Sequence, residues 1–144
     1  MKRVDYILFL LVVGVILLLF FLLYPSNKSI KNIKLLSINI DKAYILYEKK
    51  TAIFIDARYY KFYNKERIKG ALSFPLQRYN NWKEQIIKQI KPHQIIIVYC
   101  DNRLCSLSYY LVKKITELGY TNVYKLLGGL DQWKKKGYPI HSSL

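Results

Sequence analysis

Hydrophobic positions divide the chain into two regions of different pattern. From Tyr6 to Tyr24 there are 19 consecutive uncharged residues, dominated by Leu, Val, Ile and Phe. A helix of this length matches a hydrocarbon core of about 30 Å at about 1.5 Å per residue. Residues 1–25 are therefore predicted to form a transmembrane anchor, and the polar residues 26–37 a linker.

A cleaved secretory signal peptide is the alternative for this segment. Its apolar region is usually about 7–15 residues long and ends in small residues. The stretch here is longer and ends in Phe-Phe-Leu-Leu-Tyr-Pro at 20–25. We therefore predict a single-pass membrane protein that contacts the bilayer through residues 6–24. Lys2 and Arg3 favour an N-terminus inside and a domain on the extracytoplasmic side, although basic residues also follow the segment.

Beyond the linker, short apolar runs alternate with amphipathic segments. Runs rich in β-branched residues predict buried strands at 51–56 and 95–99. Further short strands are predicted at 123–126 and, after a turn, within 68–75. Apolar residues at helical spacing predict helices at 41–47, 82–90, 107–118 and 130–136, the first of them with Asp41 as its N-cap. Strands that alternate with helices imply a mostly parallel sheet covered on both faces. We predict one α/β domain over residues 38–144.

Cys100 stands directly after the predicted strand 95–99 and before a short polar loop. A helix follows from about Ser108. Loop N–H groups and the positive end of a helix dipole both favour a thiolate at such a place. Because cysteine is also among the most buried residue types, a small inert core residue is the alternative.

Asp56 and Arg58 stand at the end of the predicted strand 51–56. Sites collect at the carboxyl edge of the strands in open α/β sheets. A structural ion pair that holds a loop is the alternative, and such a pair can support a site without reacting.

The composition narrows the possible partners. The chain has 24 Lys and Arg against 9 Asp and Glu, a formal net charge of +15. This balance favours anionic partners in general. Because the lysines are scattered, with one run at Lys134, Lys135 and Lys136, we predict small anions rather than nucleic acid.

The chain has two cysteines, Cys100 and Cys105. A disulfide across so short a loop would add little stability, so the pair indicates thiol chemistry. His93 and His141 lack the spacing of zinc ligands. We predict no metal and no cofactor.

Three separated segments resemble the rhodanese-like domain. They are Phe-Ile-Asp-Ala-Arg at 54–58 followed by Ile-Lys-Gly-Ala at 68–71, then Ile-Val-Tyr-Cys at 97–100, and finally Gly-Tyr at 119–120 with Gly-Gly-Leu at 128–130 and Trp133. The resemblance implies a central parallel sheet. It also implies a sulfurtransferase site, in which Cys100 accepts a sulfane sulfur as a persulfide, and in which Asp56 and Arg58 are supporting residues.

The chain departs from the family pattern at three places, one of which is Leu127, where an acidic residue often precedes the paired glycines. Glu66 and Arg67 stand where the family usually has Gly-His, which we expect to alter loop packing more than chemistry. The segment after Cys100 is about two residues longer than in many single-domain sulfurtransferases, and it resembles a variant set with a second cysteine. The resemblance implies that this loop binds substrate through Asp101, Asn102, Arg103, Leu104, Cys105 and Ser106. Related phosphatases need an arginine where Ser106 stands, so phosphatase activity is not predicted.

The predicted function is that of a membrane-anchored sulfurtransferase or persulfide carrier. It would move sulfur from thiosulfate or polysulfide through Cys100 to a thiol or cyanide acceptor. One alternative is a thiol–disulfide redox module that uses Cys100 and Cys105. In that case Cys105 resolves a persulfide or sulfenate, whereas otherwise it packs at the start of the helix. A non-catalytic docking domain is the second alternative.

Overall fold

The computed structural model describes residues 3–23 and 35–143, and it divides into two compact units, Met1–Asn32 and Ile33–Leu144. The described part of the first unit is helix α1 (Arg3–Leu23), which has Asp5 in its first turn. Most of the predicted linker and Tyr24 lie outside the described residues.

The prediction of a membrane protein is contradicted at α1. Within 3–23 and 35–143, no helix combines the length and the apolar character that crossing a membrane requires. The predicted localisation, a single-pass membrane protein with its domain on the extracytoplasmic side, is therefore wrong, and the membrane contact predicted for residues 6–24 is not supported.

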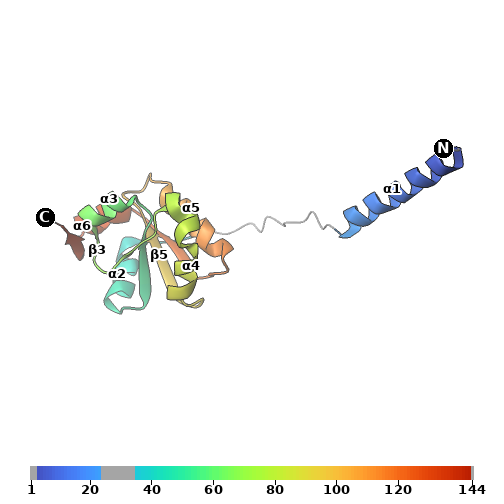
Figure 1. Ribbon diagram of the computed structural model, residues 1–144. Helices are drawn as coiled ribbons and strands as arrows, with labels where there is room; N and C mark the ends of the chain where they lie inside the picture. The colour runs from blue at the N-terminus through green and yellow to red at the C-terminus, as the bar shows by residue number, and fades with distance from the viewer. Residues whose placement is uncertain (1–2, 24–34, 144) are drawn as a thin grey trace. The chain divides into compact units, whose positions relative to one another are not determined.

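The second unit is built on a five-stranded parallel sheet (Figure 1). Its strands, in the spatial order β1-β6-β5-β2-β4, are β1 (Leu36–Ile38), β6 (Val123–Leu126), β5 (Ile95–Tyr99), β2 (Ala52–Asp56) and β4 (Leu72–Ser73). Since β5 stands in the middle of this order, it pairs along its length with β2 and β6. The predicted α/β architecture with a central parallel sheet is confirmed.

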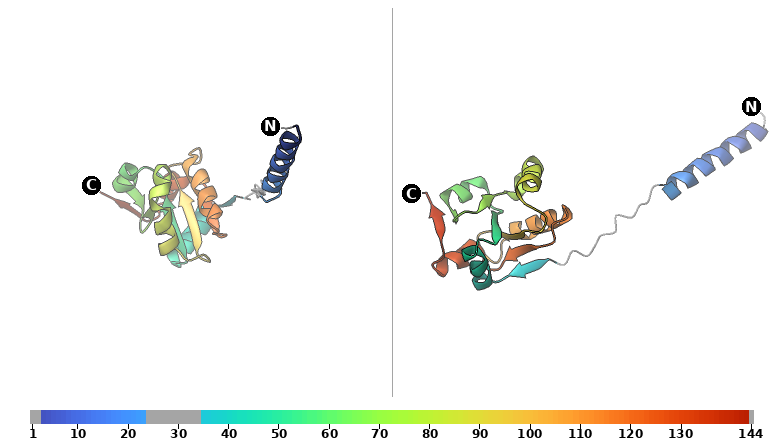
Figure 2. Two further views of the ribbon diagram at one scale, coloured as in Figure 1. Left: turned by 45° about the vertical axis from the view of Figure 1, so that its right-hand side comes forward. Right: turned by 90° about the horizontal axis from the view of Figure 1, so that it is seen from below.

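Helices cover both faces of the sheet (Figures 1 and 2). They are α2 (Ile40–Glu48), the 3-10 helix η1 (Leu76–Arg78), α4 (Tyr79–Gln89), α5 (Leu107–Glu117) and α6 (Gly129–Lys135). A further helix, α3 (Tyr60–Lys65), has no buried residue and contacts the short strand that follows it. Alternation along β5 supplies both cores, because Ile96 and Val98 pack with residues of α4 and α5, whereas Ile97 and Tyr99 pack with residues of α2 and α6.

Three short strands were not predicted. β1 falls at the end of the predicted linker, and β3 (Glu66–Ile68) pairs antiparallel with β7 (Ile140–Ser142) in a separate two-stranded sheet. Each has three residues, too few for a period-2 pattern to stand out.

The start of α2 differs from the prediction. Its N-cap is Asn39, whose side chain accepts a hydrogen bond from the Lys42 N–H at 2.9 Å. The predicted cap, Asp41, instead accepts a 2.8 Å bond from the Tyr138 hydroxyl and pairs with Lys136. Both partners lower the pKa of Asp41, the Tyr138 bond most. Asp41 therefore links α2 to the chain that follows α6.

Candidate active site in the loop after β5

Cys100 follows β5 and is buried, with 1% of its surface exposed. The backbone at this point is held by α6, which begins across the loop. The Leu130 N–H donates to the Cys100 carbonyl at 2.9 Å, and the Asp131 N–H donates to the Asp101 carbonyl at 2.8 Å. The free N–H groups of the first helical turn thus fix the position of the loop.

The glycine pair at the start of α6, Gly128 and Gly129, makes this close approach possible. Gly129 has φ +60°, and a Cβ atom there would lie 2.5 Å from the Cys100 carbonyl oxygen and 2.7 Å from that of Asp101. A side chain at Gly129 would therefore push the loop away. We predicted only a tight turn at this pair, whereas the structure adds a steric requirement toward the cysteine loop.

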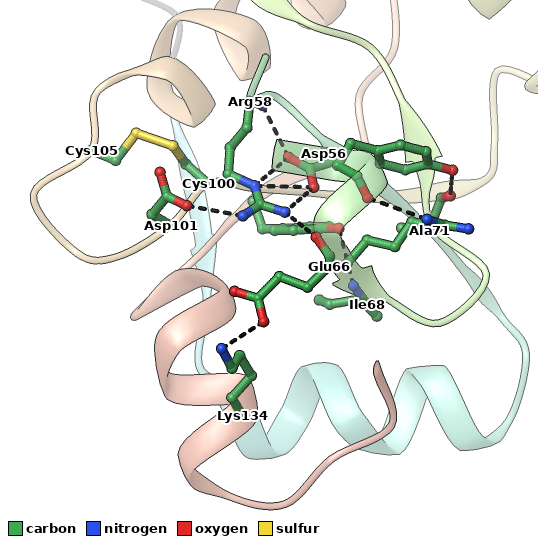
Figure 3. A network of polar contacts seen from close by, with 12 residues as sticks. Asp56, Arg58, Glu66, Ile68, Ala71, Cys100, Asp101, Cys105 and Lys134 are labelled. Carbon is green, nitrogen blue, oxygen red and sulfur yellow. Dashed lines mark hydrogen bonds and ion pairs between the residues drawn. A yellow bond between two sulfur atoms is a disulfide. The ribbon is translucent and has the colours of Figure 1, made fainter. Parts of the chain in front are cut away.

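Cys100 and Cys105 form a disulfide across the loop (Figure 3). Their Cα atoms are 6.1 Å apart. Asn102 shapes the turn between them, since its side chain accepts a bond from the Leu104 N–H and its carbonyl accepts one from the Cys105 N–H. The sequence left open whether the two sulfur atoms could meet, and the structure shows that they do.

Arg58 joins three chain segments beneath this loop (Figure 3). Its guanidinium donates to the buried carboxylate of Asp56 at 2.7–3.1 Å, to the Glu66 carbonyl at 2.6 Å, and to the Asp101 carboxylate at 2.9 Å. Burial alone would lower the pKa of Arg58, but the hydrogen bonds and charge of Asp56, with a further bond from Asp101, raise it. Arg58 is therefore a permanent cation that ties the cysteine loop to the ends of β2 and α3.

Tyr99 completes the floor of this network. Its hydroxyl accepts a 3.2 Å bond from the Ile68 N–H, and the Arg58 guanidinium lies over its ring at 5.9 Å from the centroid. Burial, followed by the negative charge of Asp56, raises the pKa of Tyr99, so the hydroxyl stays protonated. Tyr99, the residue before Cys100, is consequently held at both its hydroxyl and its ring.

Glu66 and Arg67 occupy the place where the family pattern differs. The Glu66 carboxylate pairs with Lys134 of α6 at 2.7 Å, away from the sulfur atoms (Figure 3). Arg67 lies over the Tyr63 ring and donates to the Tyr63 carbonyl. Both side chains thus contribute packing around β3.

The other loop residues that were predicted to bind substrate differ in their exposure and in what they contact. Asn102 and Arg103 line an open cavity of about 520 Å³ that also contacts Asp131 and Lys135 of α6. Leu104 is 93% exposed. Ser106 is the N-cap of α5 without a side-chain capping bond. The N–H groups of Leu104 and Cys105, which we expected among those facing a thiolate, bond to Asn102.

One group of described residues has donor atoms spaced for a metal ion. The sulfur atoms of Cys100 and Cys105 and a carboxylate oxygen of Asp101 lie within 4.8 Å of one another. In the disulfide the two sulfurs are bonded to each other and are not thiolate ligands. In this state the two cysteines therefore form a sulfur–sulfur bond and present no thiolates to a metal ion.

Sequence reasoning missed the Arg58–Asp101 contact. A signal was present, because Asp101 follows the end of β5 as Arg58 follows the end of β2, and adjacent parallel strands end at one edge. The carbonyl of Glu66 carried no such signal, since backbone groups are not distinguished by residue type.

Comparison with known proteins agrees with this description. The family model of the rhodanese-like domain matches residues 39–136. The chain therefore belongs to the rhodanese-like domain family.

Particular relatives and structures are similar over most of this region. Thiosulfate sulfurtransferase GlpE of Coxiella burnetii (strain RSA 493 / Nine Mile phase I) is 30% identical over 93 residues, which cover 65% of this chain and 81% of the relative. A protein of Buchnera aphidicola subsp. Schizaphis graminum (strain Sg), described as uncharacterized, is 33% identical over 126 residues, with 84% and 81% covered. The crystal structure of the BH2092 protein from Bacillus halodurans has a TM-score of 0.67 at 26% identity, with 74% and 77% covered.

Proposed function

We propose that this protein is a sulfurtransferase that carries sulfane sulfur as a persulfide on Cys100. Family membership supports the proposal, as does the similarity to a thiosulfate sulfurtransferase. The observation that carries it is the position of Cys100, which directly follows the central strand β5 in a loop held by α6 and by the Arg58–Asp101 ion pair.

The first half-reaction uses the Cys100 thiolate as nucleophile. It attacks the outer sulfur of thiosulfate or of a polysulfide, a new S–S bond forms on Cys100, and sulfite or a shorter polysulfide leaves. In the second half-reaction a thiol or cyanide takes the outer sulfur away. Asp56 and Arg58 position the loop and do not react.

The anionic donor would approach over residues 101–106. Arg103 and Lys135 both line the open cavity next to the loop, and two cations attract a dianion such as thiosulfate. The working unit in this proposal is the domain 38–144 together with β1.

Sulfite release tests the first half-reaction. We expect the reduced full-length protein to release sulfite from thiosulfate, and Cys100→Ser to release none while its unfolding curve stays similar. Cys105→Ala retains the nucleophile and serves as the matched cysteine control, for which sulfite release should persist. A folded, reduced protein that releases no sulfite would contradict the proposal.

A thiol–disulfide redox module is the second candidate function, favoured by the Cys100–Cys105 disulfide. In such a module Cys100 and Cys105 would cycle between the dithiol and the disulfide without any sulfane donor. It predicts that a peroxide converts the dithiol to the disulfide as readily in the absence of thiosulfate as in its presence.

A further inference from the structure

We propose that Cys105 is a resolving thiol that discharges the Cys100 persulfide as sulfide. This inference rests on the proposed function, because it needs a sulfane sulfur on Cys100. It goes further by assigning a product, inorganic sulfide, and by assigning the reductant that the protein consumes. When no external acceptor takes the sulfane sulfur first, the protein would thereby supply sulfide to a sulfide-using reaction.

The loop geometry places Cys105 against the inner sulfur of such a persulfide. The Cα atoms of Cys100 and Cys105 are 6.1 Å apart, within the range of about 4.4–6.8 Å at which two cysteines bridge without backbone movement. The two bonds to Asn102 hold the turn that brings them together. A nucleophile held this close competes effectively with thiols in solution.

Accessibility separates the roles of the two cysteines. In the disulfide Cys100 is 1% exposed, whereas Cys105 is partly exposed. A reductant from solution therefore meets the sulfur of Cys105 first, and its attack there expels Cys100 as the thiolate. The reset step restores the nucleophile for the next donor.

The discharge step balances without an additional oxidant. The Cys105 sulfur attacks the Sγ atom of Cys100, the Sγ–Sγ bond forms, and the bond to the outer sulfur breaks. The outer sulfur leaves with the electron pair as hydrosulfide, taking the proton that Cys105 gives up. Two equivalents of a cellular thiol then reduce the disulfide. The full cycle converts thiosulfate and two thiols to sulfite, hydrosulfide, a proton and an external disulfide.

A single-turnover experiment on the full chain tests the inference. The protein is reduced, freed of reductant without oxygen, and mixed with thiosulfate. Sulfite, sulfide, free thiols and intact mass are then measured. We expect the wild type to release sulfite and sulfide in equal amounts and to lose both thiols. Cys105→Ser should release the same sulfite, hold one extra sulfur atom on Cys100 and release almost no sulfide. Tyr109→Ser, at an exposed position of α5, should behave as the wild type.

The two proposals fail in different ways. The resolving role would be overturned if the wild type and Cys105→Ser both released sulfite while the wild type kept its persulfide and its free Cys105 thiol and released no sulfide. The sulfurtransferase proposal would survive that result. Absence of sulfite from both folded proteins would overturn the sulfurtransferase and the resolving role together. Cys105→Ala, tested in parallel, shows whether any loss of sulfide follows from the missing thiol rather than from the introduced hydroxyl.

Discussion

Arg58 shows how unequal the two ion pairs of one side chain can be. The Asp56 carboxylate is fully buried against it, whereas the Asp101 side chain is 48% exposed. Removing one member of a buried pair leaves an uncompensated charge in the interior, but an exposed partner is still solvated by water. The same guanidinium thus stabilises the fold on one side and orients the cysteine loop on the other.

We expect Arg58→Met to lower the free energy of unfolding by about 3–5 kcal/mol, because Asp56 is left buried without its cation. Asp101→Asn should cost less than about 1 kcal/mol, since its side chain is half exposed. Urea denaturation of the reduced proteins measures both. Equal losses for the two variants would show that Asp56 is not the dominant partner.

At the scale of elements, the contact between α6 and the cysteine loop positions the site. Gly129 and Gly137 stand just inside the start of α6 and shortly after its end, and both have positive φ, at +60° and +72°. They differ in surroundings. A Cβ atom at Gly129 meets the backbone of Cys100 and Asp101, whereas one at Gly137 has nothing within 4 Å.

Alanine substitutions at Gly129 and Gly137 can therefore be compared, with Gly137 as the control position. Gly137→Ala should cost about 1–2 kcal/mol of stability through backbone strain alone and leave sulfite release unchanged. Gly129→Ala should cost more and slow sulfite release, because the loop carbonyls must move. Unfolding and single-turnover sulfite release are measured on both. If Gly129→Ala released sulfite at the wild-type rate, the loop would not depend on the contact with α6.

The elements that sequence reasoning located are those with a strong local pattern. The β-branched run of β5 and the apolar spacing of α5 predict both elements closely. The three-residue strands β1, β3 and β7 depend on partners distant in sequence, and local pattern carries no information about them. The N-cap at Asn39 was missed because the neighbouring Asp41 has equal capping propensity. At the site, the residues were predicted by resemblance, but the meeting of Cys100 and Cys105 required the turn of the loop.

At the scale of the whole molecule, the net charge bears on which molecules the protein attracts. A net charge of +15 attracts anions from solution, and salt screens that attraction over about 10 Å at 0.1 M. The rate of encounter with a dianion should therefore depend on ionic strength, whereas encounter with a neutral reagent should not.

We expect the rate of the reduced protein with thiosulfate to fall several-fold between low and physiological salt. Alkylation of the same thiols by neutral iodoacetamide serves as the control and should change little. Stopped-flow or quenched reactions at constant pH measure both rates. Equal salt dependence for the two reagents would contradict electrostatic attraction of the donor.

Because β5 lies in the centre of the sheet, the stability of the sheet is largely separate from the structure of the loop that contains Cys100 and Cys105. This strand is paired on both sides, so Cys100 follows a part of the fold whose position does not depend on the loop. The residues after Cys100 return to the sheet through α5, and a change in their number alters the loop without shifting the strand. Evolution can therefore lengthen this segment or add a thiol to it while the same core is retained. A site with one thiol and a site with two thiols can then be built on the same fold, and few substitutions separate them.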